Sequence, residues 1–449
     1  MMAFTQRITL YARKTPGLRG VATLAAVLAL GACGGGGDDT SASATDATAG
    51  TTDGGATEPT GGSTTGAPPA GCDAYVEPGG DDVATLQGAL LDAAEGSTVC
   101  MGEGTFMLNT EISISVNGVT LKGAGRDKTI LDFSTQDIGA NGIKISGDGV
   151  TVMSFSVVET PGDGIRGDDV AGITFDDVSV GWAEKMSMDA GAYGFYPVGS
   201  SDVVIRNSRV YGARDAGIYV GQSTNILVED NEAYDNVAGI EIENSTGATV
   251  RRNRAYNNTG GILIFDLPGL PVQGGRFTLC YENIIEDNNT PNFGIPGTAV
   301  SAVPPGVGVM ILSSDQNEIR NNEIRNNNST GVVVVSYNEL LGLEPADDPN
   351  FDAFPEGNWI HDNVFENNGT MPDPLLLVAV GMPPAPDIMF DGCEGPDNMN
   401  MDPALANCVS DNGNATWMDF DLCGGFMNRN TDIESATCMH TPLPELPGG

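Results

Sequence analysis

The segments Gly217-Ile-Tyr-Val, Gly239-Ile-Glu-Ile and Gly261-Ile-Leu-Ile decide the fold, because each begins 22 residues after the one before. Each opens with glycine and then alternates inward apolar residues with variable ones. Alternation with a period of two over a few residues predicts short β-strands. The strands of a sandwich are not copies of one another, and a propeller blade needs about 40 residues. The repeat therefore predicts an all-β chain folded as a parallel β-helix, a solenoid of stacked coils.

A second repeated feature is an asparagine three residues after an apolar residue or a cysteine. Asparagine tolerates the left-handed backbone of a tight corner. Identical amides at one corner of stacked coils form a hydrogen-bonded ladder. We assign this structural role to six residues: Asn207, Asn231, Asn253, Asn283, Asn322 and Asn363. Cys280 shares the inward position of Val250 and Ile319, so we expect it to be a buried free thiol.

Composition divides the chain into four segments. Residues 1–32 hold a basic leader and an apolar run that is too short to span a bilayer, as in a signal peptide. Residues 33–71, rich in Gly, Ser, Thr, Ala and Asp, predict a disordered tether. Residues 72–370 carry the coils, preceded by a short amphipathic capping helix within residues 81–95. Residues 371–449 predict an irregular, disulfide-stapled C-terminal cap.

The sequence Leu30-Gly31-Ala32-Cys33 after the apolar run resembles the lipobox of bacterial lipoproteins. The resemblance implies that Cys33 becomes the lipidated first residue of the mature protein. We therefore expect a monomer in the bacterial cell envelope, anchored at the outer membrane by this lipid alone. Plain secretion with cleavage near Ala32 is the alternative.

Eight cysteines in an exported chain predict disulfides. Cys72 and Cys100 bracket the first folded element, and we expect them to pair. The four cysteines of the C-terminal segment should pair among themselves in a connectivity that the sequence leaves open: Cys393, Cys408, Cys423 and Cys438.

The charge balance restricts the partners. With 60 acidic and 20 basic residues the formal net charge is −40. Such a field repels nucleic acid and anionic lipid, so we expect neither as a partner. It favours loosely held divalent cations, of which Ca²⁺ suits carboxylates and carbonyls. We expect no required cofactor, and the sequence leaves any metal ligands unknown.

Residues 72–370 resemble the right-handed parallel β-helix proteins of the pectin-lyase-like superfamily. The resemblance rests on the helix before the first coil, the glycine-opened strands and the asparagine-marked turns. Segments 236–245 and 257–268 look like a subgroup of bacterial envelope proteins without an assigned activity. Many members of the superfamily cleave or epimerise acidic polysaccharides, others bind sugars, and some are scaffolds. The resemblance thus implies a fold and leaves the activity open.

In the glycine-opened strands, the residue two after the glycine should point outward, and stacked coils should place these residues in one row. The row reads Lys144, Arg166, Tyr196, Tyr219, Glu241 and Leu263. Cations pair with uronate carboxylates, and tyrosines offer flat apolar faces to sugar rings. An ordinary solvated strand face is the alternative. We predict substrate-binding roles for Lys144, Tyr193, Tyr219 and Glu241.

The extra segment from Glu184 to Tyr196 is our candidate for the catalytic site. β-Elimination needs a cation on the substrate carboxylate, a base and a proton donor. We predict these roles for Lys185, Asp189, Tyr196 and Arg166. The Asp-Pro-His-Asp signature of mannuronan epimerases and the Gly-His-Gly of polygalacturonases are absent. His361 aligns with variable positions, so we expect it to be exposed.

Two functional hypotheses follow. The first is a surface lipoprotein that engages polysaccharide and acts on it as a polyuronate lyase or epimerase. The second is a non-catalytic binding, adhesin-like or scaffold protein, which the missing catalytic signatures favour. A groove with converging ionisable groups would support the first hypothesis, and a flat repeating face would support the second.

Overall fold

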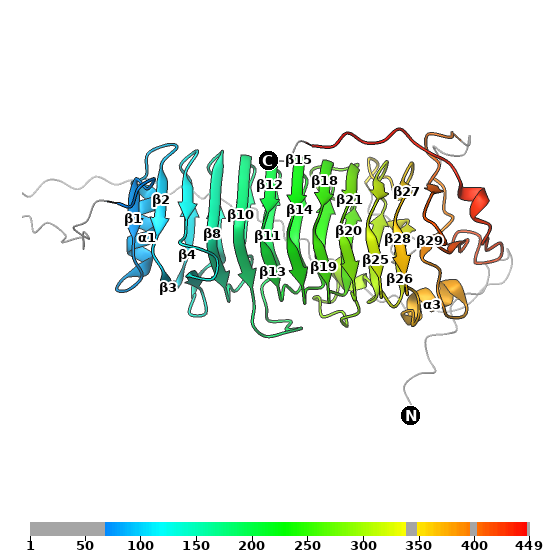
Figure 1. Ribbon diagram of the computed structural model, residues 1–449, viewed down its shortest axis with the longest axis horizontal. Coiled ribbons are helices and arrows are strands. Elements are labelled where there is room, and N and C mark those ends of the chain that lie inside the picture. Colours follow the sequence, from blue (N-terminus) through cyan, green and yellow to red (C-terminus); the bar gives the residue numbers. More distant parts are fainter. Residues whose placement is uncertain (1–67, 338–347, 396–401, 447–449) are drawn as a thin grey trace, which may run out of the picture. The chain divides into compact units, whose positions relative to one another are not determined.

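The computed structural model describes residues 68–337, 348–395 and 402–446. The predicted signal peptide, Cys33 and nearly all of the predicted tether lie outside these ranges. The described residues belong to the unit from Gly61 to Gly449. They form stacked coils of short parallel strands, in chain order from one end to the other (Figure 1). The predicted parallel β-helix is therefore confirmed.

One strand of each coil belongs to an 11-stranded sheet, here called the narrow sheet. All of its pairings are parallel, and its order follows the chain among the described residues. Its strands are β4 (Thr110–Ile114), β7 (Ile138–Ile145), β9 (Ile165–Asp168), β11 (Tyr193–Val198), β14 (Ala216–Gly221), β17 (Ala238–Glu243), β20 (Gly260–Phe265), β23 (Val307–Leu312), β26 (Thr330–Val335), β29 (Ile388–Phe390) and β31 (Trp417–Asp419).

The other strands belong to a 20-stranded sheet among the described residues, here called the wide sheet, which bends into two ladders. The first ladder contains β1 (Ala74–Val76), β2 (Thr98–Met101), β5 (Thr120–Lys122), β8 (Val150–Val158), β10 (Ala171–Gly181), β12 (Ser201–Arg206), β15 (Thr224–Glu229), β18 (Thr246–Arg251), β21 (Arg276–Tyr281), β24 (Glu318–Arg320), β27 (Trp359–His361) and β30 (Cys408–Ser410). The second shares β8 and β10 and adds β3 (Gly104–Met107), β6 (Thr129–Asp132), β13 (Arg209–Tyr211), β16 (Glu232–Tyr234), β19 (Arg254–Tyr256), β22 (Ile284–Glu286), β25 (Glu323–Arg325) and β28 (Val364–Glu366).

The core lies inside the coils, where each inward position stacks on its counterpart. Ile218 pairs with Ile240 and Ile240 with Ile262, and all three are fully buried. Each fully buried side chain of this size stabilises the fold by about 1.5–3 kcal/mol. Cys280 joins the same core opposite Val250, as a buried free thiol whose pKa burial raises to about 12.

An asparagine ladder occupies the corner between the two ladders of the wide sheet. Each side-chain amide donates to the amide oxygen of the next coil at 2.9–3.1 Å. Because these amides are buried, losing a partner would leave a polar group unsatisfied at a cost of about 1–3 kcal/mol. The members are Asn231, Asn253, Asn283, Asn322, Asn363 and Asn412.

The sequence alignment placed Asn207 in this ladder, and that placement is wrong by one residue. The backbone N–H of Ser208 donates to the Asn231 amide oxygen at 2.9 Å, so Ser208 occupies the ladder position. Asn207 takes the preceding left-handed position, with φ 52°, and donates to Asp176 at 2.8 Å. The short serine leaves the ladder without an amide at its N-terminal end.

A second ladder, which the sequence analysis did not assign, marks the corner before the narrow sheet. Its amides donate to one another at 3.0–3.2 Å. Its members are Asn236, Asn258, Asn288, Asn327 and Asn368. Two corners of each central coil are therefore fixed by amides, which holds the narrow sheet in register with the wide one.

The first coil is capped by α1 (Asp82–Leu91). Asp81 caps it by accepting a hydrogen bond from the Ala84 N–H, and Leu86 and Leu90 are buried. Leu91, in the last turn, is 61% exposed. A disulfide joins Cys72 to Cys100.

Strand pairing continues past residue 370, because β29, β30 and β31 each pair in parallel with the preceding coil. The helix α3 (Pro374–Val380) and the 3₁₀ turn η3 (Ile433–Ala436) flank these last coils. The C-terminal disulfides join Cys393 to Cys423 and Cys408 to Cys438. A further 3₁₀ turn, η1 (Val300–Ala302), lies between β22 and β23.

The expectation that His361 is exposed is wrong. Its ring is 6% exposed, stacks on Trp359 at 3.7 Å and contacts Glu318 through Nε2 at 3.1 Å. The position does point out of the coil, but its neighbours Trp359 and Glu318 enclose it, and Leu443 N–H, from the chain after Cys438, donates to Glu318. The local repeat could not reveal this packing.

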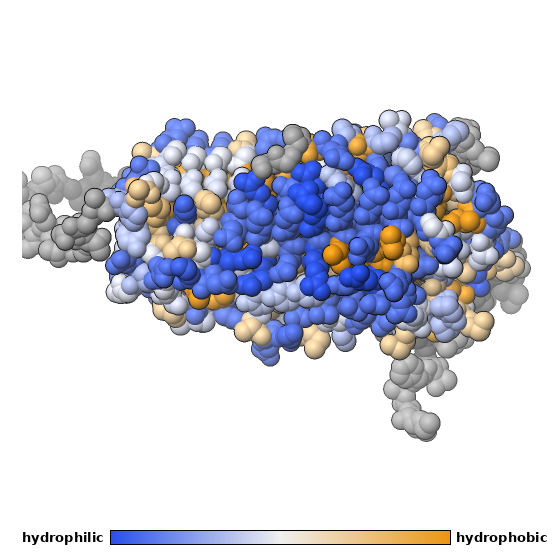
Figure 2. Space-filling view, in the orientation of Figure 1, coloured by the Kyte–Doolittle hydropathy of each residue, from blue (hydrophilic) through white to orange (hydrophobic). Residues whose placement is uncertain are grey.

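No helix among the described ranges is both long and apolar enough to cross a bilayer. Figure 2 shows one side of the coils, where hydrophilic residues predominate between two ends that carry more apolar ones.

Candidate functional site

The predicted outward row exists on the narrow sheet. Lys144 pairs with Arg166 and Arg166 with Tyr196. Farther along, Tyr219 pairs with Glu241 and Glu241 with Leu263. Parallel pairing between coils places these side chains in one column.

The column is not uniformly exposed. The side chains of Lys144 and Arg166 are 45% and 34% exposed. Tyr219, Glu241 and Leu263 are buried, at 3%, 2% and 0%. The expectation of one solvated row is therefore wrong beyond Tyr196. We call β7, β9 and β11 the open half of this face, and β14 to β26 the covered half.

One part of the cover is the chain between β22 and β23. Its side chains Phe293, Val300 and Val303 join Tyr219 and Leu263 in a second apolar cluster outside the coils. This insertion between β22 and β23 lies on the face. Other segments contribute further residues to the same outer cluster, namely Tyr337, Leu376 and Phe420. The open half consequently ends at a wall beside β14.

Three tyrosines stand at this boundary. The ring centroids of Tyr193 and Tyr196 are 4.5 Å apart, and those of Tyr196 and Tyr219 are 4.6 Å apart. The third distance, between Tyr193 and Tyr219, is 4.9 Å. The Arg166 guanidinium lies 4.7 Å from the Tyr196 ring centroid, in cation–π geometry. We call these residues the tyrosine cluster; Tyr193 and Tyr196 remain partly exposed.

The cations of the open half have carboxylate partners. Arg166 Nε lies 2.8 Å from Asp168, and its Nη1 lies 3.3 Å from Asp163. Lys144 Nζ lies 3.4 Å from the other oxygen of Asp168. A carboxylate ligand would therefore compete with Asp168, whereas sugar hydroxyls could bond to both members of each pair.

Carboxyl groups gather beside the tyrosine cluster. Burial, followed by neighbouring Glu243, raises the pKa of Asp215 to about 7, although a hydrogen bond from Tyr193 opposes the shift. Burial likewise raises the pKa of Glu243 to about 7, and Tyr219 Oη donates to it at 2.7 Å. The pKa of Asp163 rises to about 6, again through burial.

Glu241 lies beneath the cover. Burial, Glu243 and Asp215 raise the pKa of its carboxyl well above the usual value. Its Oε2 is buried without a hydrogen-bond partner among the described residues. A carboxyl in this setting is held protonated, because an ionised one would face a low dielectric and two like charges. Glu241 is thus too enclosed for the substrate contact predicted from its place in the row.

The hydroxyls of the three tyrosines are also held protonated. Burial raises the pKa of Tyr196, of Tyr193 and of Tyr219. Their hydroxyls therefore stay protonated at neutral pH, so they can act as proton donors, although weakly acidic ones, and cannot act as bases. Asp215, partly exposed and titrating near neutrality, is the group better suited to act as a base.

Two residues of the predicted catalytic set lie elsewhere. Lys185 is 70% exposed and pairs with Asp235 at 2.7 Å. Asp189 is exposed at the rim of a separate pocket of about 310 Å³, lined also by Glu159 and Trp182. The structure thus brings Tyr196 and Arg166 together and gives Lys185 and Asp189 other surroundings.

Asp163, Asp215 and Glu243 are not among the residues that the sequence pattern predicts for the site. Glu243 had a signal, because it stands two residues after Glu241 in the same alternation and so shares its outward face. Asp163 and Asp215 precede strands at a corner, where alternation no longer specifies direction. Among the described residues, no group of three His, Cys, Asp or Glu side chains is arranged to hold a metal ion.

Comparison with known proteins supports the fold. Residues 117–277 match the family described as "Right handed beta helix region". The coils in this range are thus those of a right-handed parallel β-helix. No curated protein sequence matches significantly.

Among solved structures, the A-module of the mannuronan C-5 epimerase AlgE4 from Azotobacter vinelandii is 16% identical with a TM-score of 0.48. The alignment covers 76% of this chain and 92% of that one. An α-1,3-glucanase catalytic unit from Streptomyces thermodiastaticus is 16% identical with a TM-score of 0.46, over 74% of this chain and 52% of that one. At this distance the likeness concerns architecture and carries no argument about activity.

Proposed function

We propose that this chain engages a polysaccharide on the open half of the narrow sheet, with the sugar chain ending against the tyrosine cluster. The observation that carries the proposal is Tyr196, stacked under Arg166 at the closed end of an open strand face. Aromatic rings bind the apolar faces of sugars, and paired Arg and Asp side chains bond to their hydroxyls. The insertion over β14 closes this strand face at one end.

We further propose acid–base chemistry at that end. A lyase or an epimerase removes the proton next to a uronate carboxylate and then delivers a proton, to the leaving oxygen or to the opposite face of the same carbon. Asp215 is the proposed base and the Tyr196 hydroxyl the proposed proton donor. Arg166 would release Asp168 and bind the substrate carboxylate instead. Its guanidinium would then stabilise the negative charge that develops on the substrate.

The binding proposal is tested on the mature chain with alginate, pectate, hyaluronan and a neutral glucan, with and without Ca²⁺. Co-sedimentation measures binding, and unsaturated uronate absorbance measures elimination. We expect Tyr196→Ala to weaken binding at least tenfold. The matched control is Tyr234→Ala, in the Tyr211–Tyr234–Tyr256 stack on the wide sheet. Equal binding by wild type and Tyr196→Ala would refute the site.

The catalytic proposal has its own test. Asp215→Asn should abolish elimination, or epimerisation detected by sugar composition, while retaining most binding. If the wild type binds a polymer and neither eliminates nor epimerises it, the catalytic part is wrong.

A non-catalytic binding, adhesin-like or scaffold protein is the second candidate. The observation that favours it is the pairing of Arg166 and Lys144 with carboxylates, which leaves a balanced, hydrated face. No binding to any polymer in the panel would favour this candidate.

The location of the protein is also a proposal. We propose that Cys33, outside the described residues, carries lipid that anchors the chain at the outer membrane. A Cys33→Ser variant should move from the membrane fraction to the soluble fraction. Retention of that variant in the membrane would contradict the anchor.

A further inference from the structure

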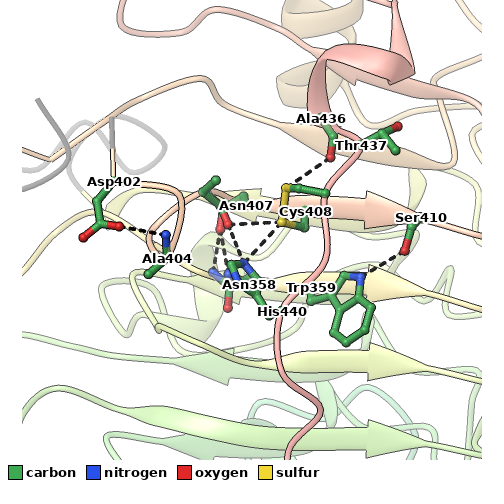
Figure 3. The surroundings of a disulfide bond; sticks show 12 residues. Asn358, Trp359, Asp402, Ala404, Asn407, Cys408, Ser410, Ala436, Thr437 and His440 are labelled. Atoms are coloured by element: carbon green, nitrogen blue, oxygen red, sulfur yellow. Dashed lines mark hydrogen bonds between the residues drawn. A yellow bond between two sulfur atoms is a disulfide. The ribbon is translucent and has the colours of Figure 1, made fainter. Parts of the chain in front are cut away.

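The last described residues lie back along the outer face of the wide sheet. In Figure 1 the red segment runs from the C-terminal coils toward β15 and β18. The Cys408–Cys438 disulfide fixes its start. There His440 Nε2 lies 2.8 Å from the Ala406 carbonyl oxygen and 3.3 Å from Cys408 Sγ (Figure 3). We call residues 440–446 the tail.

Beneath the tail runs a column of charged and aromatic side chains. Parallel pairing aligns Glu229 with Arg251, Arg251 with Tyr281, Tyr281 with Arg320, and Arg320 with His361. These positions point out of the coils and would ordinarily be solvated. Instead the side chains of Arg251 and Glu229 are only 8% and 6% exposed.

Burying such charges is unfavourable unless each one is paired and hydrogen-bonded. Arg251 bonds to Glu229 at 2.8 Å and to the Tyr281 hydroxyl at 2.8 Å. The Arg320 guanidinium lies 4.4 Å from the Tyr281 ring centroid. Apolar side chains would fill a permanently covered face at less cost. A charged, fully hydrogen-bonded face instead suits a surface that is sometimes open to water.

The tail satisfies the groups that remain in this column. The Leu443 N–H donates to Glu318 Oε2 at 2.6 Å, and Arg251 Nη1 donates to the Leu446 carbonyl oxygen at 3.3 Å. Arg320 Nη2 lies 2.5 Å from the Glu445 carboxylate, and this hydrogen bond holds the Glu445 pKa below its usual value. The groove therefore binds two backbone groups and one carboxylate of an extended peptide.

The fit between the tail and the groove is incomplete. A pocket of about 400 Å³ remains there, lined by Phe277 and Trp359 from the coils and by Pro442, Leu443 and Pro444 from the tail. This pocket is open to water, so its two walls do not pack against each other. Proline keeps the free segment extended, so little chain entropy is lost when it docks.

We propose that this groove is a docking site for an extended, acidic, proline-containing peptide of a partner protein, and that the tail occupies it in cis. Glu445 stands in for the partner's carboxylate, which Arg320 recognises in a chain that is otherwise strongly acidic. The disulfide tether gives the tail a high effective concentration, so a partner binds only after the tail leaves.

The test keeps the full chain intact during folding. A site-specific protease sequence is inserted after Met439, which is 72% exposed. The folded protein is then cut and passed through gel filtration. The probe is a fluorescent synthetic peptide with the sequence of residues 440–449, followed by anisotropy. We expect it to bind the cut protein, and to bind the uncut protein at least tenfold more weakly.

Substitutions identify the groove. Arg320→Ala in the cut protein should weaken peptide binding at least fivefold, as should Glu445→Gln in the peptide. Arg206→Ala is the matched control, because Arg206 lies in the same strand ladder and bonds to Asp176 instead of the tail. Retention of the cut tail through gel filtration, absence of peptide binding, or equal binding to cut and uncut protein would each overturn the proposal.

Discussion

In the open half of the narrow sheet the outward column carries Lys144, Arg166 and Tyr196, whereas in the covered half it carries Leu263, Met310 and Val333. The backbone pairing is the same in both halves. What differs is the chain outside the coils, since several segments outside the coils pack on the second half and leave the first to water. In a solenoid, therefore, an outward position is exposed only where nothing returns to cover it.

Replacing an apolar residue by a charged one in the covered half of the column should have the largest effect on stability. Leu263→Lys places an ammonium group in an apolar cluster, at a cost of about 4 kcal/mol or more. We expect a large fall in melting temperature or in soluble yield. If the variant were as stable as wild type, the cover would not be packed as described.

Weakening the cover itself should have the next largest effect. Phe293 is 7% exposed within the outer cluster, and Phe293→Ala should cost about 3 kcal/mol. Hydrogen exchange should accelerate in β17 and β20, which lie under the cover. Faster exchange spread evenly over all coils would instead indicate general destabilisation.

The boundary between the halves should respond to pH. Glu243 has a folded pKa of about 7, above its unfolded value, so the folded state binds more protons between about pH 4.5 and 7. The stability of the wild type should therefore fall as pH rises through that window. Glu243→Gln removes this penalty. The unfolding free energy of the variant minus that of the wild type should therefore be about 1–3 kcal/mol more favourable at pH 8 than at pH 5, measured by denaturant unfolding.

Glu286→Gln is the matched control for this pH effect. Burial acts to raise the pKa of Glu286, but hydrogen bonds from Arg254 and Arg325 outweigh it and lower the pKa. The contribution of Glu286 to the unfolding free energy is therefore lost only as pH falls below its unfolded pKa, which lies outside the window from pH 5 to 8. A pH slope unchanged by Glu243→Gln would contradict the buried state of that carboxyl.

The reciprocal change in the open half should have the smallest effect. Lys144→Leu removes a half-exposed ion pair with Asp168 and should alter stability by less than about 1 kcal/mol. The comparison with Leu263→Lys uses one column, two coil positions and the same pair of residue types. A cost similar to that of Leu263→Lys would mean that both halves are covered.

The coils could be predicted because their information is local and repeated. Gly217, Gly239 and Gly261 recur at the coil length, and Asn231 and its successors mark one corner. Asn207 was misplaced because the spacing to Asn231 is one residue longer than the coil it spans. The row from Lys144 to Leu263 followed from alternation alone.

The site could be predicted only in part, because burial in it depends on segments that do not repeat. Nothing in the alternation around Glu241 shows that residues near Phe293 will lie above it. The same holds for His361 and the tail. Asp215 gains its raised pKa from burial and from neighbouring Glu243, so its role was visible only in the folded chain.

The three disulfides of the described residues lie at the two ends of the coil stack, and each spans 28 or 30 residues, somewhat more than the 22-residue repeat. In a linear array an interior coil has two neighbours and a terminal coil has one, so thermal unravelling ordinarily starts at the ends. Crosslinks at both ends remove that easy route. Loss of structure must then begin in the middle, where two interfaces break at once. The chain should consequently persist by slow unfolding more than by a deep free-energy minimum, and thiol reduction should shorten its lifetime far more than its melting temperature suggests.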